Sequence, residues 1–283
     1  MRDYAGKVVV ITGAANGMGA ELARRYAGAG ARLALFDIDE ENLESLRKEL
    51  DEGGATVWGR PGDVADARAV QAFADEVFTR FDRVDVLYNN AGVISAGLTW
   101  EEPAEDWDWL LGVNLLGLVN GIRAFVPRMN AQDFPSDVVN TDSIASFLPV
   151  ENSPVYVASK YAAFGMSQVF DLQLQTLQSP VRSHAVCPAI VQTDLARCNE
   201  HRNQPDFDPA DHPYLTSEDY LKRWAVVKGS LPYGMPVDEA VTRIIDGVEA
   251  DRFAIFTHPQ YNPQIALGVQ ALLDGHHPAL VQR

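Results

Sequence analysis

The sequence is poor in cysteine and holds no pattern typical of a metal site. Its two cysteines, Cys187 and Cys198, form no CxxC motif, and no histidine pair stands at metal-ligand spacing. So few cysteines exclude a disulfide-stapled secreted scaffold and are typical of a cytoplasmic protein. We therefore expect no metal site and a cytoplasmic location.

Basic residues are scarce relative to acidic ones. Lys and Arg total 23 against 39 Asp and Glu, which gives a formal net charge of −16 at pH 7. This excess of negative charge opposes binding to the phosphates of nucleic acids and to anionic lipids. We expect no nucleic acid and no membrane among the partners.

Long hydrophobic runs are missing as well. The apolar run near the N-terminus is too short for the core of a signal peptide, so no export signal is expected. The longest apolar stretch, residues 110–126, is interrupted by Asn114, Asn120 and Arg123. Such interruptions are typical of a buried helix and not of a membrane span.

The chain does contain an alternation of short apolar runs with helical patterns. Hydrophobic residues make up 47% and charged residues 22% of the 283 residues, a balance typical of one compact domain over residues 1–283. The alternation favours an α/β fold, a single-domain Rossmann fold with a doubly wound parallel sheet of about seven strands. Strands are predicted at 8–12, 33–36, 56–58, 84–88, 137–140, 181–187 and 253–256, and helices at 20–29, 40–50, 66–81, 107–129, 155–177 and 237–250.

Residues 190–236 interrupt this alternation. The segment is polar, rich in proline and dotted with aromatic residues, and it is too long for a plain connection, so we predict a helical substrate-binding lid. Within it, Thr216-Ser217-Glu218-Asp219 resembles a capping box and predicts a short helix over 220–224. Residues 257–283 are predicted as a C-terminal tail.

A glycine cluster follows the first predicted strand. Between this strand and the next helix the chain reads Thr12-Gly13-Ala14-Ala15-Asn16-Gly17-Met18-Gly19. Bare backbone at this place could approach a pyrophosphate, and the helix N-terminus would supply N–H donors. A plain tight turn would also use these glycines, but their position between a strand and a helix favours a dinucleotide site.

Asp37 follows the second predicted strand, 24 residues after Gly13. From there a carboxylate can accept hydrogen bonds from the adenosine ribose, although it could also cap a helix. The carboxylate would repel a 2′-phosphate, and no Arg or Lys stands at Asn16 or Ile38 to bind one. The sequence therefore predicts NAD, and not NADP, as the cofactor.

Tyr156 and Lys160 stand four residues apart in a predicted helix, so they lie on one face with Cβ atoms about 5–6 Å apart. A neighbouring ammonium and a positively charged nicotinamide ring would lower the pKa of Tyr156 and make the pair a usable acid and base. The same spacing is common on solvated helix faces, so the pair needs support from other motifs.

Four motifs together resemble the short-chain dehydrogenase/reductase family over nearly the whole chain. Thr12–Gly19 matches TGxxxGxG, Asn89–Gly92 matches NNAG, and Tyr156 with Lys160 matches YxxxK, with Ser143 thirteen residues upstream of Tyr156. The resemblance implies hydride transfer between an alcohol carbon and the nicotinamide ring.

The resemblance also implies a catalytic set of four residues. Tyr156 would move the hydroxyl proton, and Ser143 would hydrogen-bond the alkoxide or carbonyl oxygen. Lys160 would bind the nicotinamide ribose, and Asn114 would hold through its backbone a water that links Lys160 to solvent. The implied cofactor-binding residues are Gly13, Asn16, Gly17, Met18, Gly19, Asp37, Ile38, Asp63, Val64, Asn90, Ala91, Gly92, Tyr156, Lys160, Pro188, Ile190 and Thr193.

One position departs from the family pattern. The family usually has Pro-Gly after the sixth strand, where this chain has Pro188-Ala189. An alanine is tolerated there if its φ is negative, so we still expect the Ile190 backbone and the Thr193 hydroxyl to hold the carboxamide.

The predicted substrate region is apolar. No Arg or Lys lies near Ser143 in sequence, which favours a bulky neutral secondary alcohol or its ketone over an anionic substrate. Residues 108–129 and 253–259 also resemble the NAD-dependent C-alpha dehydrogenases of lignin-derived aryl ethers. The predicted substrate-binding residues are Ser143, Phe147, Val150, Tyr156 and Leu195, with Ile144 and Ile190 beside them. Aromatic residues of the lid either join them or merely anchor the lid: Phe207, Tyr214, Tyr220, Trp224 and Tyr233.

Two other functions fit the same motifs. One is an NADPH-dependent biosynthetic carbonyl reductase of steroid, terpene or ketoacyl type, and the other is a non-catalytic nucleotide-sensing protein. A binding-only protein has no chemical need for the set of Asn114, Ser143, Tyr156 and Lys160. The helices at 107–129 and 155–177 are apolar on more than one side, and the resemblance implies a homodimer or homotetramer.

Overall fold

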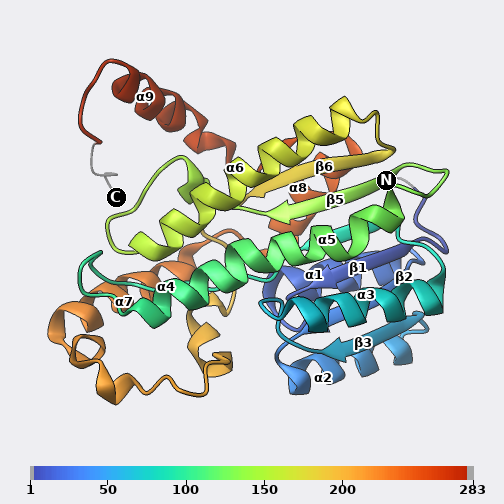
Figure 1. Ribbon diagram of the computed structural model, residues 1–283, viewed down its shortest axis with the longest axis horizontal. Helices are drawn as coiled ribbons and strands as arrows, with labels where there is room; N and C mark the ends of the chain where they lie inside the picture. Colours follow the sequence, from blue (N-terminus) through green and yellow to red (C-terminus); the bar gives the residue numbers. More distant parts are fainter. Residues whose placement is uncertain (1–2, 279–283) are drawn as a thin grey trace.

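A parallel sheet of seven strands forms the centre of the molecule (Figure 1). The computed structural model describes residues 3–278, so residues 1–2 and 279–283, the ends of the predicted domain and tail, lie outside the described residues. The spatial order of the strands is β3-β2-β1-β4-β5-β6-β7. Their bounds are β1 Val8–Thr12, β2 Arg32–Asp37, β3 Val57–Pro61, β4 Val86–Asn89, β5 Ser136–Thr141, β6 Val181–Cys187 and β7 Ala254–Phe256.

Helices connect successive strands and cover both faces of the sheet (Figure 1). The α-helices are α1 Gly17–Gly28, α2 Glu40–Glu52, α3 Ala67–Phe81, α4 Ala104–Leu111, α5 Leu118–Met129, α6 Pro154–Thr176, α7 Glu218–Ser230, α8 Val237–Glu249 and α9 Asn262–Leu273. Short 3₁₀ turns lie at Ile144–Ser146, Leu195–His201, Pro209–Asp211, Pro213–Thr216, Leu231–Tyr233 and Pro259–Tyr261.

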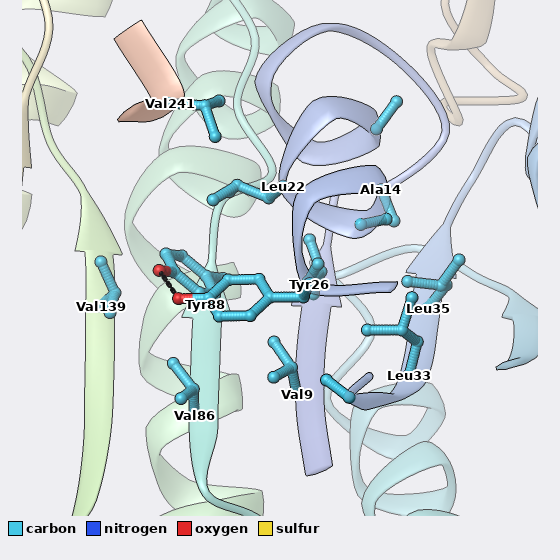
Figure 2. Close-up of a cluster of buried hydrophobic side chains, with 14 of the residues drawn as sticks. Val9, Ala14, Leu22, Tyr26, Leu33, Leu35, Val86, Tyr88, Val139 and Val241 are labelled. Carbon is cyan, nitrogen blue, oxygen red and sulfur yellow. Dashed lines mark hydrogen bonds between the residues drawn. The ribbon is translucent and has the colours of Figure 1, made fainter. Parts of the chain in front are cut away.

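The side chains of β1 alternate between two hydrophobic layers, as strand geometry requires. Val8 and Val10 belong to the layer that includes residues of α3, α4, α5 and α6. Val9 and Ile11 belong to the opposite layer, which includes residues of α1, α2 and α8. Figure 2 shows part of this second layer, where the hydroxyls of Tyr26 and Tyr88 are 2.7 Å apart. The predicted single-domain, doubly wound Rossmann fold is thus confirmed.

The order of the strands places a crevice beside the end of β1. This strand pairs with β2 on one side and with β4 on the other, so the loops that follow β1 and β4 leave in different directions. In open parallel sheets ligands bind at such a reversal, outside the carboxyl ends of the strands. The glycine cluster and the Asn89–Gly92 motif both begin at this edge.

The helix predicted at 107–129 begins earlier in the structure than in the prediction, and its middle is not α-helical. It runs from Ala104 to Met129, and its middle, Gly112–Gly117, is a π-helix that includes Asn114. This segment is long and apolar enough to cross a membrane, but half of its most apolar window is buried inside the protein. Its contacts with α3 and α6 are those of a core helix, as expected from its polar interruptions.

Two regions near the C-terminus contain more helix than the sequence predicts. The helix within residues 190–236 is α7, which spans Glu218–Ser230, and Ser217 caps it by accepting a hydrogen bond from the Tyr220 N–H at 3.2 Å. The predicted tail contains α9, whose apolar residues surround the helix and give little amphipathic periodicity. That pattern explains why the sequence gives no helix signal there.

A buried ion pair attaches the 190–236 segment to α4. Arg202 donates a hydrogen bond to Asp106, both side chains are less than one-tenth exposed, and the guanidinium lies over the rings of Phe207 and Trp109. Burial raises the pKa of Asp106, while the hydrogen bond and charge of Arg202 lower it. Removing only the cation would leave a buried carboxylate without its partner, which typically costs about 3–5 kcal/mol.

We therefore expect Arg202→Met to loosen this attachment. Amide hydrogen exchange in residues 195–216 should become at least about 100-fold faster, the equivalent of about 3 kcal/mol. The double variant Arg202→Met/Asp106→Leu, which also removes the stranded carboxylate, should recover most of the protection. Unchanged exchange in Arg202→Met would show that the pair does not hold the segment.

Candidate active site

One cavity of about 1240 Å³ follows the carboxyl ends of the strands. It extends from the glycine cluster and Asp37 to Tyr156, and it is bordered by residues of the 190–236 segment. Every predicted cofactor-binding residue lines it except Gly19. The structure thus brings motifs from six parts of the chain into one continuous site.

The glycine cluster is shaped by close backbone contacts. Gly13 has a φ of +63°, and a Cβ on it would lie 2.6 Å from the Cα of Ala91. A Cβ on Gly19 would lie 2.0 Å from the Gly13 carbonyl oxygen. This clash explains why position 19 requires a glycine although Gly19 does not line the cavity. The Asn90 side chain donates to the Gly13 carbonyl at 3.0 Å, so the NNAG motif braces the loop from the next strand.

Asp37 stands at the end of β2 and lines the cavity. Its carboxylate accepts hydrogen bonds from the backbone N–H groups of Ala15, at 2.8 Å, and Asp39, at 2.9 Å. Burial raises the pKa of Asp37, and these two hydrogen bonds lower it. The N-cap of α2 is Asp39 and not Asp37, which removes the alternative role considered for Asp37.

The 190–236 segment crosses the cavity near Asp39 and Asp63. His201 Nε2 lies 3.4 Å from the Asp39 carboxylate, and Asn203 donates to Asp63 at 3.2 Å. Asp63 and Val64 line the same end of the cavity, and Asn120 donates to the Val64 carbonyl at 2.9 Å. This segment therefore borders the end of the cavity at which the adenosine was expected, and not only the substrate end.

Ser143, Tyr156 and Lys160 converge on the middle of the cavity. The Ser143 side chain interacts with Tyr156 and lowers the pKa of its phenol. Lys160 Nζ lies 5.8 Å from the centroid of the Tyr156 ring and donates to the Thr141 carbonyl oxygen at 2.8 Å. Ser143 follows the end of β5 and the other two side chains lie one turn apart on α6, so the geometry expected from the YxxxK spacing is present.

Burial dominates the proton affinities of these groups. It raises the pKa of Tyr156, an effect that the Ser143 side chain opposes and the charge of Asp142 reinforces. It lowers the pKa of Lys160 to about 8, against the opposing effect of the Asp142 charge. The Tyr156–Lys160 spacing predicts that Lys160 and the nicotinamide ring lower the pKa of Tyr156, but among the protein's own groups burial has the larger effect.

Asn114 lies beside the site and not in the cavity wall. Its side chain accepts from the Val93 N–H at 2.9 Å and donates to the Val93 carbonyl at 3.0 Å and to Ser159 Oγ at 2.9 Å. These bonds occupy the side chain, so a role for Asn114 falls to its backbone. The π-helical turn around Asn114 interrupts the regular α-helical bonding, and such turns occur frequently at functional sites.

The Pro188-Ala189 departure leaves the loop after β6 intact. Ala189 is not among the residues with positive φ, which was the condition for tolerating its side chain. Its N–H donates to His258 Nδ1 at 3.3 Å, and Pro188, Ile190 and Thr193 line the cavity.

All but one of the predicted substrate-binding residues line the cavity. Ser143, Val150, Tyr156 and Leu195 line the cavity, together with Ile144 and Ile190. Phe147 does not line it and instead packs against Phe164 and Phe256, with ring centroids 4.6 Å and 5.3 Å away. The Phe147 side chain thus points into this aromatic cluster although Leu148 and Val150 beside it line the cavity, so the assignment of Phe147 is corrected.

The aromatic residues of the 190–236 segment also lie outside the cavity lining. Tyr214 accepts a hydrogen bond from the Leu98 N–H at 3.0 Å, Phe207 stacks on His212, and Tyr220 stacks on Trp224. Tyr233 is 90% exposed. Phe207, Tyr214, Tyr220 and Trp224 thus anchor the segment, which was the alternative considered for them, whereas the exposed Tyr233 does neither.

The cavity wall contains apolar residues that the sequence analysis missed. Ile94 and Leu148 come from loops after β4 and β5, Val227 and Leu231 from α7 and the turn after it, and Tyr261 from the turn before α9. Their positions depend on how distant segments pack.

Residues 7–204 match the family described as short chain dehydrogenase. Over 278 residues the chain is 36% identical to the "CLA biosynthesis dehydrogenase/reductase" of Lactiplantibacillus plantarum, covering 98% of this chain and 97% of the relative. Over 283 residues it is 30% identical to the "C alpha-dehydrogenase" of Sphingobium sp. (strain NBRC 103272 / SYK-6), covering 98% and 89%. The latter confirms the weaker resemblance noted above.

Solved structures agree with these matches. A short-chain dehydrogenase/reductase from Burkholderia phymatum in complex with NAD shares 31% identity with a TM-score of 0.93, covering 100% of both chains. A metagenomic short-chain oxidoreductase in complex with NADP shares 35% identity with a TM-score of 0.61, covering 66% of this chain and 84% of its own. The protein therefore belongs to the short-chain dehydrogenase family of oxidoreductases.

Proposed function

We propose that this protein is an NAD-dependent oxidoreductase that interconverts a bulky apolar secondary alcohol, aromatic or alicyclic, and its ketone. The observation that carries the proposal is the meeting of Ser143, Tyr156 and Lys160 in the same cavity as the glycine cluster and Asp37. A dinucleotide along the strand ends would place its ring near Tyr156, and the open backbone at Gly13 fits this use.

Each polar group of the site then has a chemical task. The residues of the cavity would hold NAD, which when bound would supply a hydride acceptor for the alcohol carbon or, as NADH, a hydride donor for the ketone carbon. Tyr156 exchanges the hydroxyl proton with substrate, and Ser143 hydrogen-bonds the substrate oxygen while charge develops on it. Lys160 holds the ribose and its ammonium favours ionisation of Tyr156, while the Asn114 backbone supports a water path to Lys160.

The preference for NAD rests on the charge at the adenosine end. Asp37 presents a carboxylate held by two backbone N–H groups, and Asp39 lies beside it. A 2′-phosphate there would meet like charges, which costs several kcal/mol. The NAD complex of the Burkholderia phymatum structure supports this choice, whereas the NADP complex of the metagenomic structure shows that related folds accept the other cofactor.

The substrate class follows from the apolar end of the cavity. Val150, Leu195, Val227 and Leu231 lie in its wall, and a neutral substrate could be covered there without a charged partner. Segment 190–236, the predicted lid, would close this end.

We propose that the protein is located in the cytoplasm and forms a symmetric homodimer or homotetramer. Leu116, Val169 and Leu172 are each at least half exposed on the π-helix and α6. An interface between copies would cover these side chains.

A screen of NAD reduction at 340 nm tests the proposed function. Aromatic, alicyclic and steroid secondary alcohols are offered with NAD and, separately, with NADP at equal low concentration. We expect turnover of at least one bulky apolar alcohol, faster with NAD. Faster turnover with NADP would overturn the role of Asp37 and favour a biosynthetic reductase, and nucleotide binding without turnover in either direction would favour a sensor.

A further inference from the structure

Asp142 is a buried acid inside the site to which the proposed function gives no task. It stands between β5 and Ser143, is 1% exposed and lines the cavity. Its Oδ2 accepts a hydrogen bond from Ser167 Oγ at 3.2 Å, and its Oδ1 is buried with no hydrogen-bond partner among residues 3–278. A buried carboxylate held by one hydroxyl is costly unless a cation compensates its charge.

Lys160 is the cation that acts on Asp142. It is 3% exposed, and its ammonium donates a hydrogen bond to the carbonyl oxygen of Thr141, which is the residue before Asp142. The interaction is reciprocal, because Lys160 lowers the pKa of Asp142 and Asp142 raises the pKa of Lys160. Both side chains line the cavity, and their charges act on each other there as one buried unit.

Two further titratable groups face this unit. Tyr156 lies on α6 with Lys160, and the Asp142 charge raises the pKa of Tyr156. Cys187 lies at the end of β6, where burial raises its pKa well above the usual value and keeps the thiol neutral. The Asp142 carboxylate thus has the same effect on Lys160 and Tyr156, because its negative charge makes the proton of each side chain harder to lose.

We propose that Asp142 is a positioning residue for the proposed reaction, whose carboxylate is the counter-ion of Lys160 and holds Lys160 and Tyr156 in their protonated forms. This inference rests on the proposed function. The protonated pair is the state that donates a proton from Tyr156 to a ketone oxygen. Asp142 therefore extends ketone reduction toward higher pH.

The pH range of this effect follows from the charges. Burial raises the pKa of Asp142 to about 7, so the carboxylate is mostly neutral at pH 6 and mostly charged at pH 8. Burial lowers the pKa of Lys160 to about 8 even with Asp142 present. Removing the Asp142 charge should therefore matter little at pH 6 and strongly near pH 8, where Lys160 loses its proton.

The variant Asp142→Asn tests this pH dependence, because asparagine has nearly the same shape as aspartate and its amide oxygen can still accept the hydrogen bond from Ser167. We expect the high-pH decline of kcat for ketone reduction to move down by about one pH unit, the effect of about 1.4 kcal/mol. At pH 6 kcat should remain within about threefold of the wild type. A loss that is uniform across pH, or an unmoved midpoint, would overturn the proposal in favour of a merely structural role.

A second measurement needs no substrate and separates this inference from the proposed function. In protein made with ¹³C-labelled lysine, the Lys160 side-chain resonance, assigned with Lys160→Met, is titrated by NMR. Its midpoint should fall by about one pH unit in Asp142→Asn and stay unchanged in the control Asp171→Asn, which removes an equal charge from α6 outside the cavity lining. An unshifted midpoint overturns the role of Asp142, whereas a shift in a protein that turns over no alcohol or ketone overturns only the proposed function.

Discussion

Replacing Tyr156 by phenylalanine should lower turnover at least about 100-fold while leaving NADH binding within about threefold of the wild type. The phenol is the group that exchanges the substrate proton, and positioned acid–base groups typically contribute 10² to 10⁴ in rate. The ring itself would remain beside Lys160, so the cofactor contacts of the cavity should persist. Steady-state rates and a fluorescence titration with NADH measure the two quantities separately.

The matched control is Tyr161→Phe. Tyr161 lies on the same helix but is 44% exposed and outside the cavity lining. Its hydroxyl should be dispensable, and the variant should retain wild-type turnover. Near-normal activity of Tyr156→Phe would remove Tyr156 from the reaction, and an equal loss in both variants would indicate damage to α6 instead.

The second large effect is expected at Asp37. The variant Asp37→Asn removes the charge that faces a 2′-phosphate, and relief of a like-charge contact worth several kcal/mol should change the ratio of kcat/KM for NAD and NADP by about 100-fold or more toward NADP. The rate with NAD should also fall, because an amide has one acceptor oxygen for the two N–H groups of Ala15 and Asp39.

Glu40→Gln is the control for this experiment. It removes an equal charge at the start of α2 from a residue that does not line the cavity. The ratio for the two cofactors should stay within about threefold of the wild type. If Asp37→Asn left the ratio equally unchanged, the carboxylate would not be the determinant of cofactor choice.

The fold was predictable because its signals are local. Each strand is a short apolar run bounded by polar residues, and the alternation with helical patterns leaves few topologies other than a doubly wound sheet. The glycine cluster was predictable for the same reason, since its glycines stand directly between a strand pattern and a helix pattern. The pairing of Tyr156 with Lys160 follows from helix periodicity alone.

Other parts of the site depend on packing between distant segments. Phe147 is close to Ser143 in sequence, but the turn at Ile144–Ser146 sends it into a cluster with Phe164 and Phe256. Tyr261 reaches the cavity from the far end of the chain. No pattern of neighbouring residues reports such contacts, which are set by the tertiary structure.

Asp142 shows a further limit of sequence reasoning. An aspartate beside a strand end is ordinarily exposed or caps a turn, and the chain gives no sign that this one is buried. Its importance comes from its single hydroxyl partner and from the Lys160 charge, which only the folded protein brings together.

Transfer of a deuterium label shows whether the protein moves hydride between an alcohol carbon and the nicotinamide ring. A secondary alcohol that carries deuterium on its carbinol carbon is incubated with NAD and the protein, and the NADH is examined by NMR. We predict that the label appears at C4 of the nicotinamide ring on one face only, and that Tyr156→Phe shows at least about a 100-fold slower transfer. Label released to water, or no transfer from any bulky apolar alcohol, would contradict the account.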